Sequence, residues 1–224
     1  FTFDHHLDGI EWEGYGCSNP IAASTCEIIY EIFKSLGDAN IDDKIAQCLY
    51  VGIVTDSSRF MTSNMTPHVH EIAAHLLTYP SVVVDKIYEN LYGSFRFSRM
   101  KLVGHLLCHC MRTIKGYKVA YIFLSFEDSN RYKIYPGDTE GIVNYALSIK
   151  NVSVAAMFKE KEDGTYISFR SIGDFAVNEF SIKYFGGGGH KNAAGGSSKM
   201  SLQNTISKFE ETIKNYDELK YVEQ

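Results

Sequence analysis

Two patterns of apolar and polar residues follow one another along the chain, and the first is mainly helical. Phe1-Thr2-Phe3 is typical of the end of a strand. Residues 20–36 carry apolar side chains at helical spacing, and Ser18-Asn19-Pro20 before them and Gly37 after them predict a helix. The same spacing predicts three more helices, one that opens at Thr66-Pro67, one over 82–92 and one over 95–114.

From Gly116 onward the alternation of apolar and polar residues is typical of strands. Gly164 follows Glu162-Asp163 and predicts the turn of a hairpin. Strands are predicted over 117–126, 152–158 and 165–169, and helices over 138–149 and from Asp174 onward. The change of pattern predicts an α/β fold of two domains, with expected boundaries at 1–94, a connecting helix over 95–115, and 116–224.

Composition predicts a soluble, cytoplasmic protein. The chain has 224 residues, 45% of them hydrophobic, and no run of 18 apolar residues or basic-then-apolar leader indicates a membrane partner. Its five cysteines include no C-x-x-C pair, which favours reduced, mostly buried thiols. The formal charge of −5 argues against a track for long nucleic acid, although a small phosphorylated ligand needs only one local positive pocket.

Charged and imidazole side chains follow two of the apolar segments. Asp4-His5-His6 comes directly after the first strand, and Asp56 follows the apolar segment 45–54. Residues at the carboxyl ends of strands in open α/β sheets face the crevice where ligands bind. We therefore interpret Asp4-His5-His6 as a cluster that meets a metal or a phosphate, with a short polar turn as the structural alternative.

A second cluster lies in the glycine-rich segment 186–195. Four glycines followed by His190 predict a loop whose backbone N–H groups approach an anion closely, and Lys191 adds charge. The alternative is a flexible surface loop. Arg170-Ser171 at the end of a predicted strand is a second candidate for an anion clamp, because Arg offers a planar fork of donors to phosphate.

A third cluster, His105 to Cys110, has two His residues four positions apart on one helical face. Leu residues separate these potential metal ligands, and no Glu lies beside the histidines. An amphipathic connecting helix therefore explains the pattern better than a metal site.

The order of these motifs resembles the DHH/DHHA1 phosphoesterases, and most of all their bacterial nanoRNase and pAp-phosphatase branch. Asp4-His5-His6, Gly52 to Asp56 and Gly186 to Gly195 carry the resemblance over nearly the whole chain. Ser168 to Ser171 and Thr139 to Val143 are similar to the second domain of that branch. The fold implied is a partial parallel-sheet DHH domain and a smaller α/β DHHA1 domain joined by a linker helix.

The resemblance also implies a metal-dependent hydrolase with two Mn²⁺ ions, for which Mg²⁺ is the substitute. Carried over by residue, His5 and Asp56 would be metal ligands, Asp4 a ligand or the group that orients one, and His6 a contact to the scissile phosphate or a proton carrier. The residues implied to hold the substrate are Arg170, Ser171, Gly187, Gly188, Gly189 and His190.

The resemblance places a further strand-helix-strand portion, which supplies about half of the metal ligands, before the region that begins at Phe1. We expect that portion either to precede this chain or to be lost, and in the latter case the dinuclear site would be incomplete. Ser58 stands where the resemblance would place a glycine. The implied assembly is a homodimer.

Several functions remain open at this level. The first is hydrolysis of short oligoribonucleotides, including 3'-5' exonuclease action on nanoRNA, or dephosphorylation of 3'-phosphoadenosine 5'-phosphate (pAp). The alternatives are a phosphodiesterase for cyclic or linear dinucleotides, a phosphatase for inorganic polyphosphate, and a nucleotide-binding protein without catalysis. Base contacts are not readable from the sequence, so it does not choose among the substrates.

Overall fold

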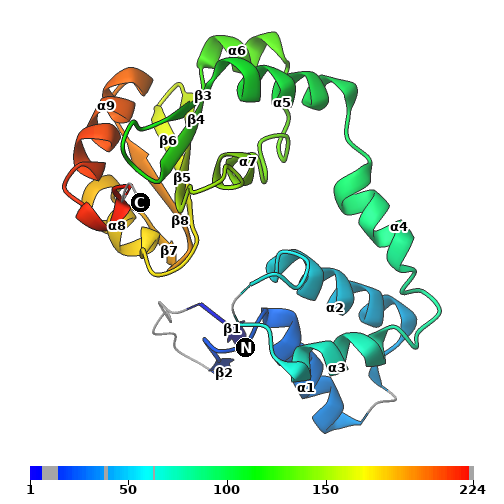
Figure 1. Cartoon of the computed structure of the whole chain (residues 1–224). Coiled ribbons are helices and arrows are strands. Elements are labelled where there is room, and N and C mark those ends of the chain that lie inside the picture. The colour runs from blue at the N-terminus through cyan, green and yellow to red at the C-terminus, as the bar shows by residue number, and fades with distance from the viewer. Residues whose placement is uncertain (7–14, 38–39, 63, 222–224) are drawn as a thin grey trace. The chain divides into compact units, whose positions relative to one another are not determined.

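The computed structural model describes residues 1–6, 15–37, 40–62 and 64–221. It divides into two compact units, Phe1–Ser94 and Phe95–Gln224, and each is described by itself (Figure 1). Both units combine helices with strands, which confirms the predicted α/β class. Among the helices that the structure describes, none is long and apolar enough to cross a membrane.

The first unit joins a parallel pair of strands to a group of helices. Strands β1 (Thr2–Asp4) and β2 (Gly16–Ser18) pair in parallel, with Asp4 opposite Ser18. The helical elements are α1 (Thr25–Leu36), α2 (Asp43–Asp56), α3 (Pro67–Leu76), α4 (Val84–Tyr88) and the π-helical turn η2 (Glu89–Gly93). Buried side chains of α2 and α3, among them Ile53 and Leu76, form the core of this unit. The predicted helix opening at Thr66-Pro67 is confirmed, with Thr66 as its N-cap.

The predicted start of α1 is wrong by five residues. Ser24 accepts a hydrogen bond from the Glu27 N–H, and the Glu27 carboxylate accepts one from the Ala23 N–H at 2.6 Å. This arrangement is similar to a capping box, although Glu27 bonds the residue before the N-cap Ser24, and the helix begins at Thr25. The cap overrides the signal of Ser18-Asn19-Pro20. Residues 20–23 form turns and bends before the helix, and Ala22, Ala23 and Ser24 are buried.

The second unit is built on a six-stranded mixed sheet. Its strand order is β3-β4-β5-β6-β8-β7, with β4 and β5 parallel and the other pairs antiparallel. The strands are β3 (Met111–Thr113), β4 (Val119–Leu124), β5 (Val154–Lys161), β6 (Gly164–Ser171), β7 (Gly188–His190) and β8 (Ala193–Ser198). The helices are α5 (Phe97–His109), α6 (Phe126–Arg131), α7 (Val143–Leu147), α8 (Val177–Phe185), α9 (Leu202–Ile213) and the 3₁₀ turn η3 (Asp217–Leu219).

The two faces of the sheet bury different cores, as the alternation along β5 requires. Val154, Ala156 and Phe158 point to one face, where they pack with residues of α8 and α9. Ala155 and Met157 point to the other face, where they pack with residues of α5 and α7. Figure 1 shows α8 and α9, in yellow to red, on one side of the sheet and α7 on the other.

The strands predicted over 152–158 and 165–169 and their hairpin are confirmed, because β5 and β6 pair from Val154↔Ser171 to Lys161↔Gly164. Three helix predictions are wrong at their ends. The helix predicted over 95–114 ends at His109, since residues 111–113 pair with β4. The helix predicted over 138–149 is shorter and comprises only α7 (Val143–Leu147), because Tyr135 to Asp138 form a turn. The helix predicted from Asp174 onward is α8, which begins at Val177.

The cysteines are free thiols, as expected, but the prediction that they are mostly buried is wrong. Cys17, Cys48 and Cys108 are exposed, Cys26 is half-buried and Cys110 is buried. The exposed Cys17 lies on β2, Cys48 on α2 and Cys108 on α5.

The start of α5 is tied to the turn before α7 by a buried carboxylate. The guanidinium of Arg96 donates to both oxygens of Asp138, at 2.9 and 2.8 Å, and the Tyr135 N–H donates to the same carboxylate at 2.9 Å. Burial alone would raise the pKa of Asp138, but these donors outweigh it and the pKa is lowered. Asp138 therefore stabilises the second unit in its ionised form.

Replacing Asp138 with Ala should lower the free energy of unfolding of the second unit by about 2 to 3 kcal/mol, because a buried charge-assisted pair is lost. Asp174→Ala is the matched control, since Asp174 is fully exposed beside Lys191 and should cost under about 1 kcal/mol. Because the pKa of Asp138 is lower in the folded protein than in the unfolded chain, where it is about 3.9, the ionised carboxylate stabilises the fold above that pH. This stabilisation is lost as the pH falls through the pKa of the folded state. Denaturant titration at pH 7 should separate the variants, and their difference should shrink below about pH 4. Equal losses from both substitutions would contradict this role.

Candidate active site

His5 lies at the carboxyl end of β1 and meets the last residue of α2. Its ring is buried, with 7% of the residue exposed. Nδ1 lies 3.3 Å from the Ala22 carbonyl oxygen, and Nε2 lies 3.1 Å from Oδ2 of Asp56. The Asn64 side-chain amide donates to the same Ala22 oxygen at 3.2 Å, which fixes that carbonyl. The structure thus brings together the two residues that the resemblance assigned to the metal.

The His5 and Asp56 pair fits a divalent cation. In the tautomer in which Nδ1–H donates to the Ala22 carbonyl, Nε2 carries the lone pair, and this arrangement orients metal-binding histidines in many proteins. Two ligands at about 2.1 Å from an ion, at right angles, are about 3.0 Å apart. The measured 3.1 Å agrees with that separation. A nitrogen and a carboxylate oxygen suit Mn²⁺, Zn²⁺ or Mg²⁺ to different degrees, so the donor set does not choose the ion.

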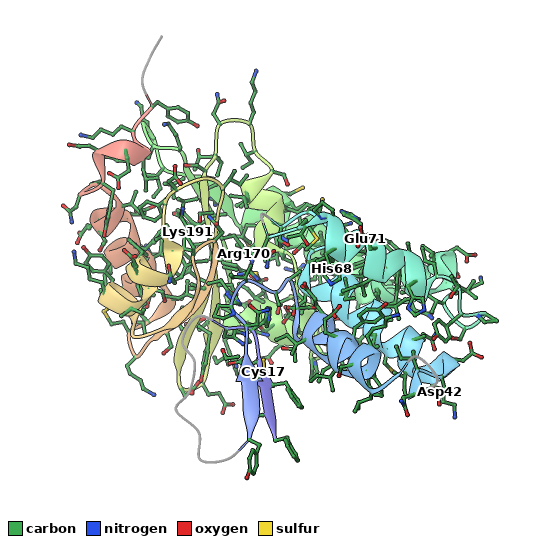
Figure 2. The ribbon with its side chains drawn as sticks, turned by 90° about the horizontal axis from the view of Figure 1, so that it is seen from below. Cys17, Asp42, His68, Glu71, Arg170 and Lys191 are labelled. Carbon is green, nitrogen blue, oxygen red and sulfur yellow. The ribbon has the colours of Figure 1, made fainter. Side chains whose placement is uncertain are left out.

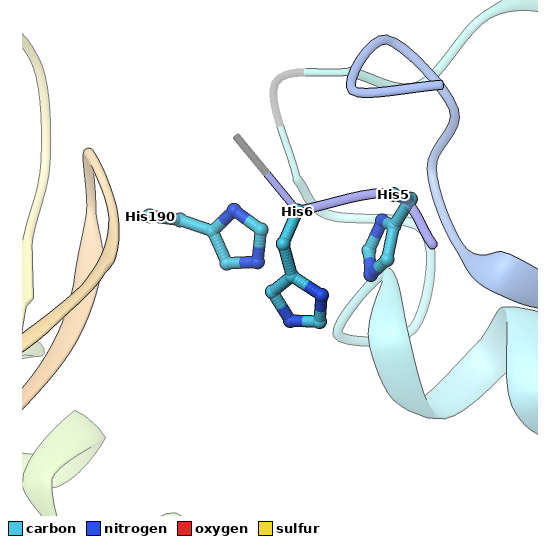
Figure 3. Close-up of side chains that lie close together, drawn as sticks. All are labelled: His5, His6 and His190. Atoms are coloured by element: carbon cyan, nitrogen blue, oxygen red, sulfur yellow. The ribbon is translucent and has the colours of Figure 1, made fainter. Parts of the chain in front are cut away.

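Asp4 holds the ring of His6. Oδ1 of Asp4 lies 2.6 Å from Nδ1 of His6 and also accepts from the His6 N–H at 3.2 Å. The side-chain hydrogen bond to His6 is the main reason that the pKa of Asp4 is lowered. The ring centroids of His5 and His6 are 4.8 Å apart, edge to face, and Figure 3 shows the two imidazoles next to each other. Since 58% of the His6 side chain is exposed, it can reach a ligand.

Asp56 is followed by a strained turn. Ser58, Arg59 and Phe60 have φ angles of 49°, 67° and 63°, in the left-handed region that side chains other than glycine rarely adopt. The buried Ser57 hydroxyl donates to the Ile53 carbonyl and accepts from the Phe60 N–H, which ties the turn to α2. The φ angle of Ser58 explains why a glycine suits this position. Strain of this kind collects at functional sites.

In the second unit, the glycine-rich segment is not the loop that its composition predicts. Gly186, with φ 57° and ψ 30°, ends α8 in the left-handed conformation, and residues 188–190 then form the edge strand β7. Gly188 pairs with Gly195 and His190 with Ala193. The phosphate-cradling loop is therefore corrected to a hairpin, because pairing with β8 overrides the low strand propensity of glycine.

Arg170 and His190 lie in one row across three strands. Arg170 is opposite Ala193, and Ala193 is opposite His190. Directly paired residues project to the same face, so Arg170 and His190 flank Ala193 about 10 Å apart, at twice the strand spacing. The next row on this face consists of Ser168, Gly195 and Gly188. The Arg170 guanidinium and the His190 imidazole thus flank a surface of small residues, formed by Ala193, Gly195 and Gly188, where an anion can approach the backbone.

Among the residues that the structure describes, Arg170 has no carboxylate partner. Within the described residues no carboxylate oxygen lies within 4.0 Å of it, and its Nη1 donates to the Phe169 carbonyl at 2.8 Å. Burial lowers the pKa of Arg170, and the more distant Glu140 opposes this effect. An Arg in this state keeps donors for a phosphate, whose charge would compensate its own.

Ser171 and Lys191 are occupied by contacts within the unit. The Ser171 hydroxyl donates to the Phe175 carbonyl at 2.7 Å and accepts from the Asn192 amide at 2.8 Å, on the face opposite Arg170. Lys191 donates to Asp174 at 3.0 Å, and Figure 2 labels both Lys191 and Arg170. Asn192 was missed by sequence reasoning, although an Asn in a two-residue turn is a recognised signal.

The four glycines differ in what they require. A Cβ at Gly187 would lie 1.8 Å from the Gly195 carbonyl oxygen and 2.4 Å from the Ser181 hydroxyl. Gly189 has φ 134°, and a Cβ there would lie 2.6 Å from the Ala193 oxygen. At Gly188 a Cβ meets nothing within 4 Å. Gly187 and Gly189 therefore allow β7 and β8 to pack, whereas Gly188 borders open space on the face of Arg170.

Gly187→Ala should destabilise the second unit by about 2 kcal/mol or more, because backbone must move to admit the methyl group. Gly188→Ala is the matched control and should change the free energy of unfolding by less than about 1 kcal/mol. The measurement is chemical denaturation followed by circular dichroism. Equal stability of the two variants would contradict the packing described for β7.

Residues 115–216 match the family model of the DHHA1 domain, so the second unit contains a DHHA1 domain. Together with the relatives below, this match confirms the resemblance to the DHH/DHHA1 phosphoesterases.

Relatives of this chain include the bifunctional oligoribonuclease and PAP phosphatase NrnA of Bacillus subtilis, 26% identical over 87% of this chain and 61% of the relative. The protein of the same name from Thermus thermophilus is 27% identical over 95% of this chain and 63% of the relative. Among solved structures, an exopolyphosphatase-related protein from Bacteroides fragilis matches with a TM-score of 0.89 and 32% identity, over 96% of this chain and 63% of that one. The chain therefore spans about three fifths of the length of these relatives.

Proposed function

We propose that this chain is part of a metal-dependent phosphoesterase that hydrolyses short oligoribonucleotides and removes the 3'-phosphate of pAp. The names of its relatives support this substrate class. The observation that carries the proposal is the pair of donor atoms Nε2 of His5 and Oδ2 of Asp56, 3.1 Å apart. We further propose Mn²⁺ as the ion, a homodimer as the assembly and the cytoplasm as the location.

His5 and Asp56 would hold the ion, together with ligands from outside the described residues. When bound, such an ion polarises a phosphoryl oxygen and lowers the pKa of its water, which generates a nucleophile near neutral pH. His6 is the candidate proton carrier, because Asp4 fixes its Nδ1 and leaves Nε2 as the nitrogen that exchanges a proton with the leaving oxygen. His5 keeps its lone pair in position through the Ala22 carbonyl.

Arg170 and His190 would hold a phosphate other than the one that is cleaved. The planar fork of Arg170 can donate two hydrogen bonds to a phosphate, and His190 can donate a further one. The surface of small residues between them has no large side chain that would block the ligand. This pairing suits substrates with more than one phosphate, such as pAp or a dinucleotide.

A second candidate is a phosphatase for inorganic polyphosphate, favoured by the description of the Bacteroides fragilis relative as exopolyphosphatase-related. The test is hydrolysis by the natural protein, with and without Mn²⁺, of pAp, an RNA dinucleotide and a short polyphosphate. The proposal predicts Mn²⁺-dependent turnover of pAp and the dinucleotide and at least about tenfold lower kcat/KM on polyphosphate. A preference for polyphosphate would favour the second candidate, and nucleotide binding without any turnover would indicate a binding protein.

A further inference from the structure

Three side chains of types that bind metals converge within the second unit. His105 lies on α5, Cys110 is the residue that ends α5, and Asp128 lies in the first turn of α6. Their ligand atoms all lie within 4.8 Å of one another. Nε2 of His105 is 3.5 Å from Sγ of Cys110 and 3.2 Å from Oδ1 of Asp128.

These separations agree with the edges of a tetrahedral zinc site. With Zn–N and Zn–O at about 2.1 Å and Zn–S at about 2.3 Å, the nitrogen is about 3.6 Å from sulfur and about 3.4 Å from oxygen. The measured values are 3.5 and 3.2 Å. Three protein ligands leave a fourth position for water, as in zinc sites that stay open to solvent.

Hydrogen bonding alone explains the cluster less well. The same nitrogen of His105 faces both Sγ of Cys110 and Oδ1 of Asp128, and one imidazole nitrogen carries at most one hydrogen. A Cys-His-Asp nucleophile would need the carboxylate on the other ring nitrogen. Only a shared cation uses all three atoms in the same way.

The surroundings fix two of the three ligands. The Ser125 hydroxyl donates to Oδ2 of Asp128 at 2.9 Å, which turns Oδ1 toward His105. The Cys110 N–H donates to Leu106 and its carbonyl accepts from Phe123, so the backbone at the cysteine is held on both sides. Cys110 itself is buried, with 4% exposed, whereas 18% of the side chains of His105 and Asp128 is exposed. The site is thus preorganised and still reachable from solvent.

We propose that His105, Cys110 and Asp128 bind one thiophilic divalent ion, zinc, that joins the end of α5 to the start of α6. From the sequence, we judge a metal site formed by His105 and His109 a poorer explanation than an amphipathic helix. The structure instead supplies Cys110 and, from a separate helix, Asp128. Unlike the pair of His5 and Asp56, this cluster offers a sulfur ligand.

Cobalt(II) in place of zinc tests the proposal, since thiolate ligation gives a near-ultraviolet charge-transfer band that carboxylate and imidazole ligands do not give. Titration of the full-length protein with Co²⁺ should produce this band at one ion per chain, and Zn²⁺ should abolish it. Cys108→Ser, which changes an exposed cysteine of the same helix, should keep the band. Cys110→Ser and His105→Ala should lose it, and Asp128→Asn should weaken Co²⁺ binding by at least about tenfold.

No band in the wild-type protein at saturating Co²⁺, or a band that survives Cys110→Ser, would overturn the proposal. The first outcome would leave His105 and Asp128 as an ion pair between two helices. Because Cys110 is buried, circular dichroism should confirm that each variant is folded. Asp128→Asn keeps the size of the side chain and decides the matter if Cys110→Ser does not fold.

Discussion

Asp56→Asn should lower kcat on a dinucleotide by at least about a hundredfold, and His5→Gln should do the same. Loss of a group that merely orients a ligand costs 10- to 100-fold in many metal sites, and loss of a ligand itself should cost at least as much. The Asn side chain keeps the shape of Asp56 but not the charge that a cation requires. Steady-state hydrolysis by the natural protein at saturating Mn²⁺ is the measurement.

Asp85→Asn is the control for this prediction, because Asp85 is an exposed carboxylate of the same unit. It should leave kcat within about twofold. A fully active Asp56→Asn enzyme would mean that the contact between the buried His5 and the half-exposed Asp56 has only a structural role. Excess Mn²⁺ should partly restore His5→Gln if the defect is weak metal binding.

Arg170→Ala should raise KM for a dinucleotide by about 5- to 150-fold with a smaller change in kcat. A charged contact to phosphate is worth about 1 to 3 kcal/mol, and such an interaction supports substrate and transition state alike. His190→Ala should behave similarly. Lys183→Ala removes a positive charge from α8, on the opposite face of the sheet, and should leave KM unchanged.

Arg170→Lys should give an intermediate KM, because Lys keeps the charge but not the planar fork. Activity should also fall as the RNA lengthens, since a chain with a formal charge of −5 offers no long basic track. An unchanged KM for Arg170→Ala, or equal rates on a dinucleotide and a long RNA, would contradict the proposal that the second unit binds the substrate.

The sequence predicted best those elements whose local signals agree with their packing. The hairpin of β5 and β6 joins an apolar run to a strand of alternating residues through an Asp-Gly turn, and the structure confirms this pairing. The helix α3 has a Thr N-cap and Pro at its first position, and it begins at Pro67. At these places propensity, pattern and cap all favour the same structure.

The sequence predicted less well those elements that depend on partners far along the chain. Nothing local distinguishes Gly188 to His190 as a strand, because its conformation comes from pairing with Ala193 to Gly195. Residues 111–113 were predicted as the end of a helix, and pairing with β4 makes them a strand. Contacts between segments that are far apart in the sequence determine the conformation of both segments, and a local sequence pattern does not encode such contacts.

The same limit applies to the candidate sites. Asp4, His5 and His6 stand in one motif, so the sequence could single them out. The contact of His5 with Asp56 joins a strand end to a helix end, and only the family resemblance linked the two residues. No motif linked Asp128 to His105 and Cys110, because the first turn of α6 brings that carboxylate to them from outside the helix.

The most direct test compares two measurements on the Asp56→Asn protein: its affinity for an uncleaved dinucleotide, by calorimetry, and its turnover. The comparison separates chemistry in the first unit from substrate binding in the second. We expect a Kd within about threefold of the wild-type value, which is a change below 1 kcal/mol, together with the loss of turnover. Arg170→Ala should show the reverse, with weakened binding and a kcat that changes little at saturation. An Asp56→Asn protein that loses binding as fully as it loses turnover, or that keeps its turnover, would contradict the account.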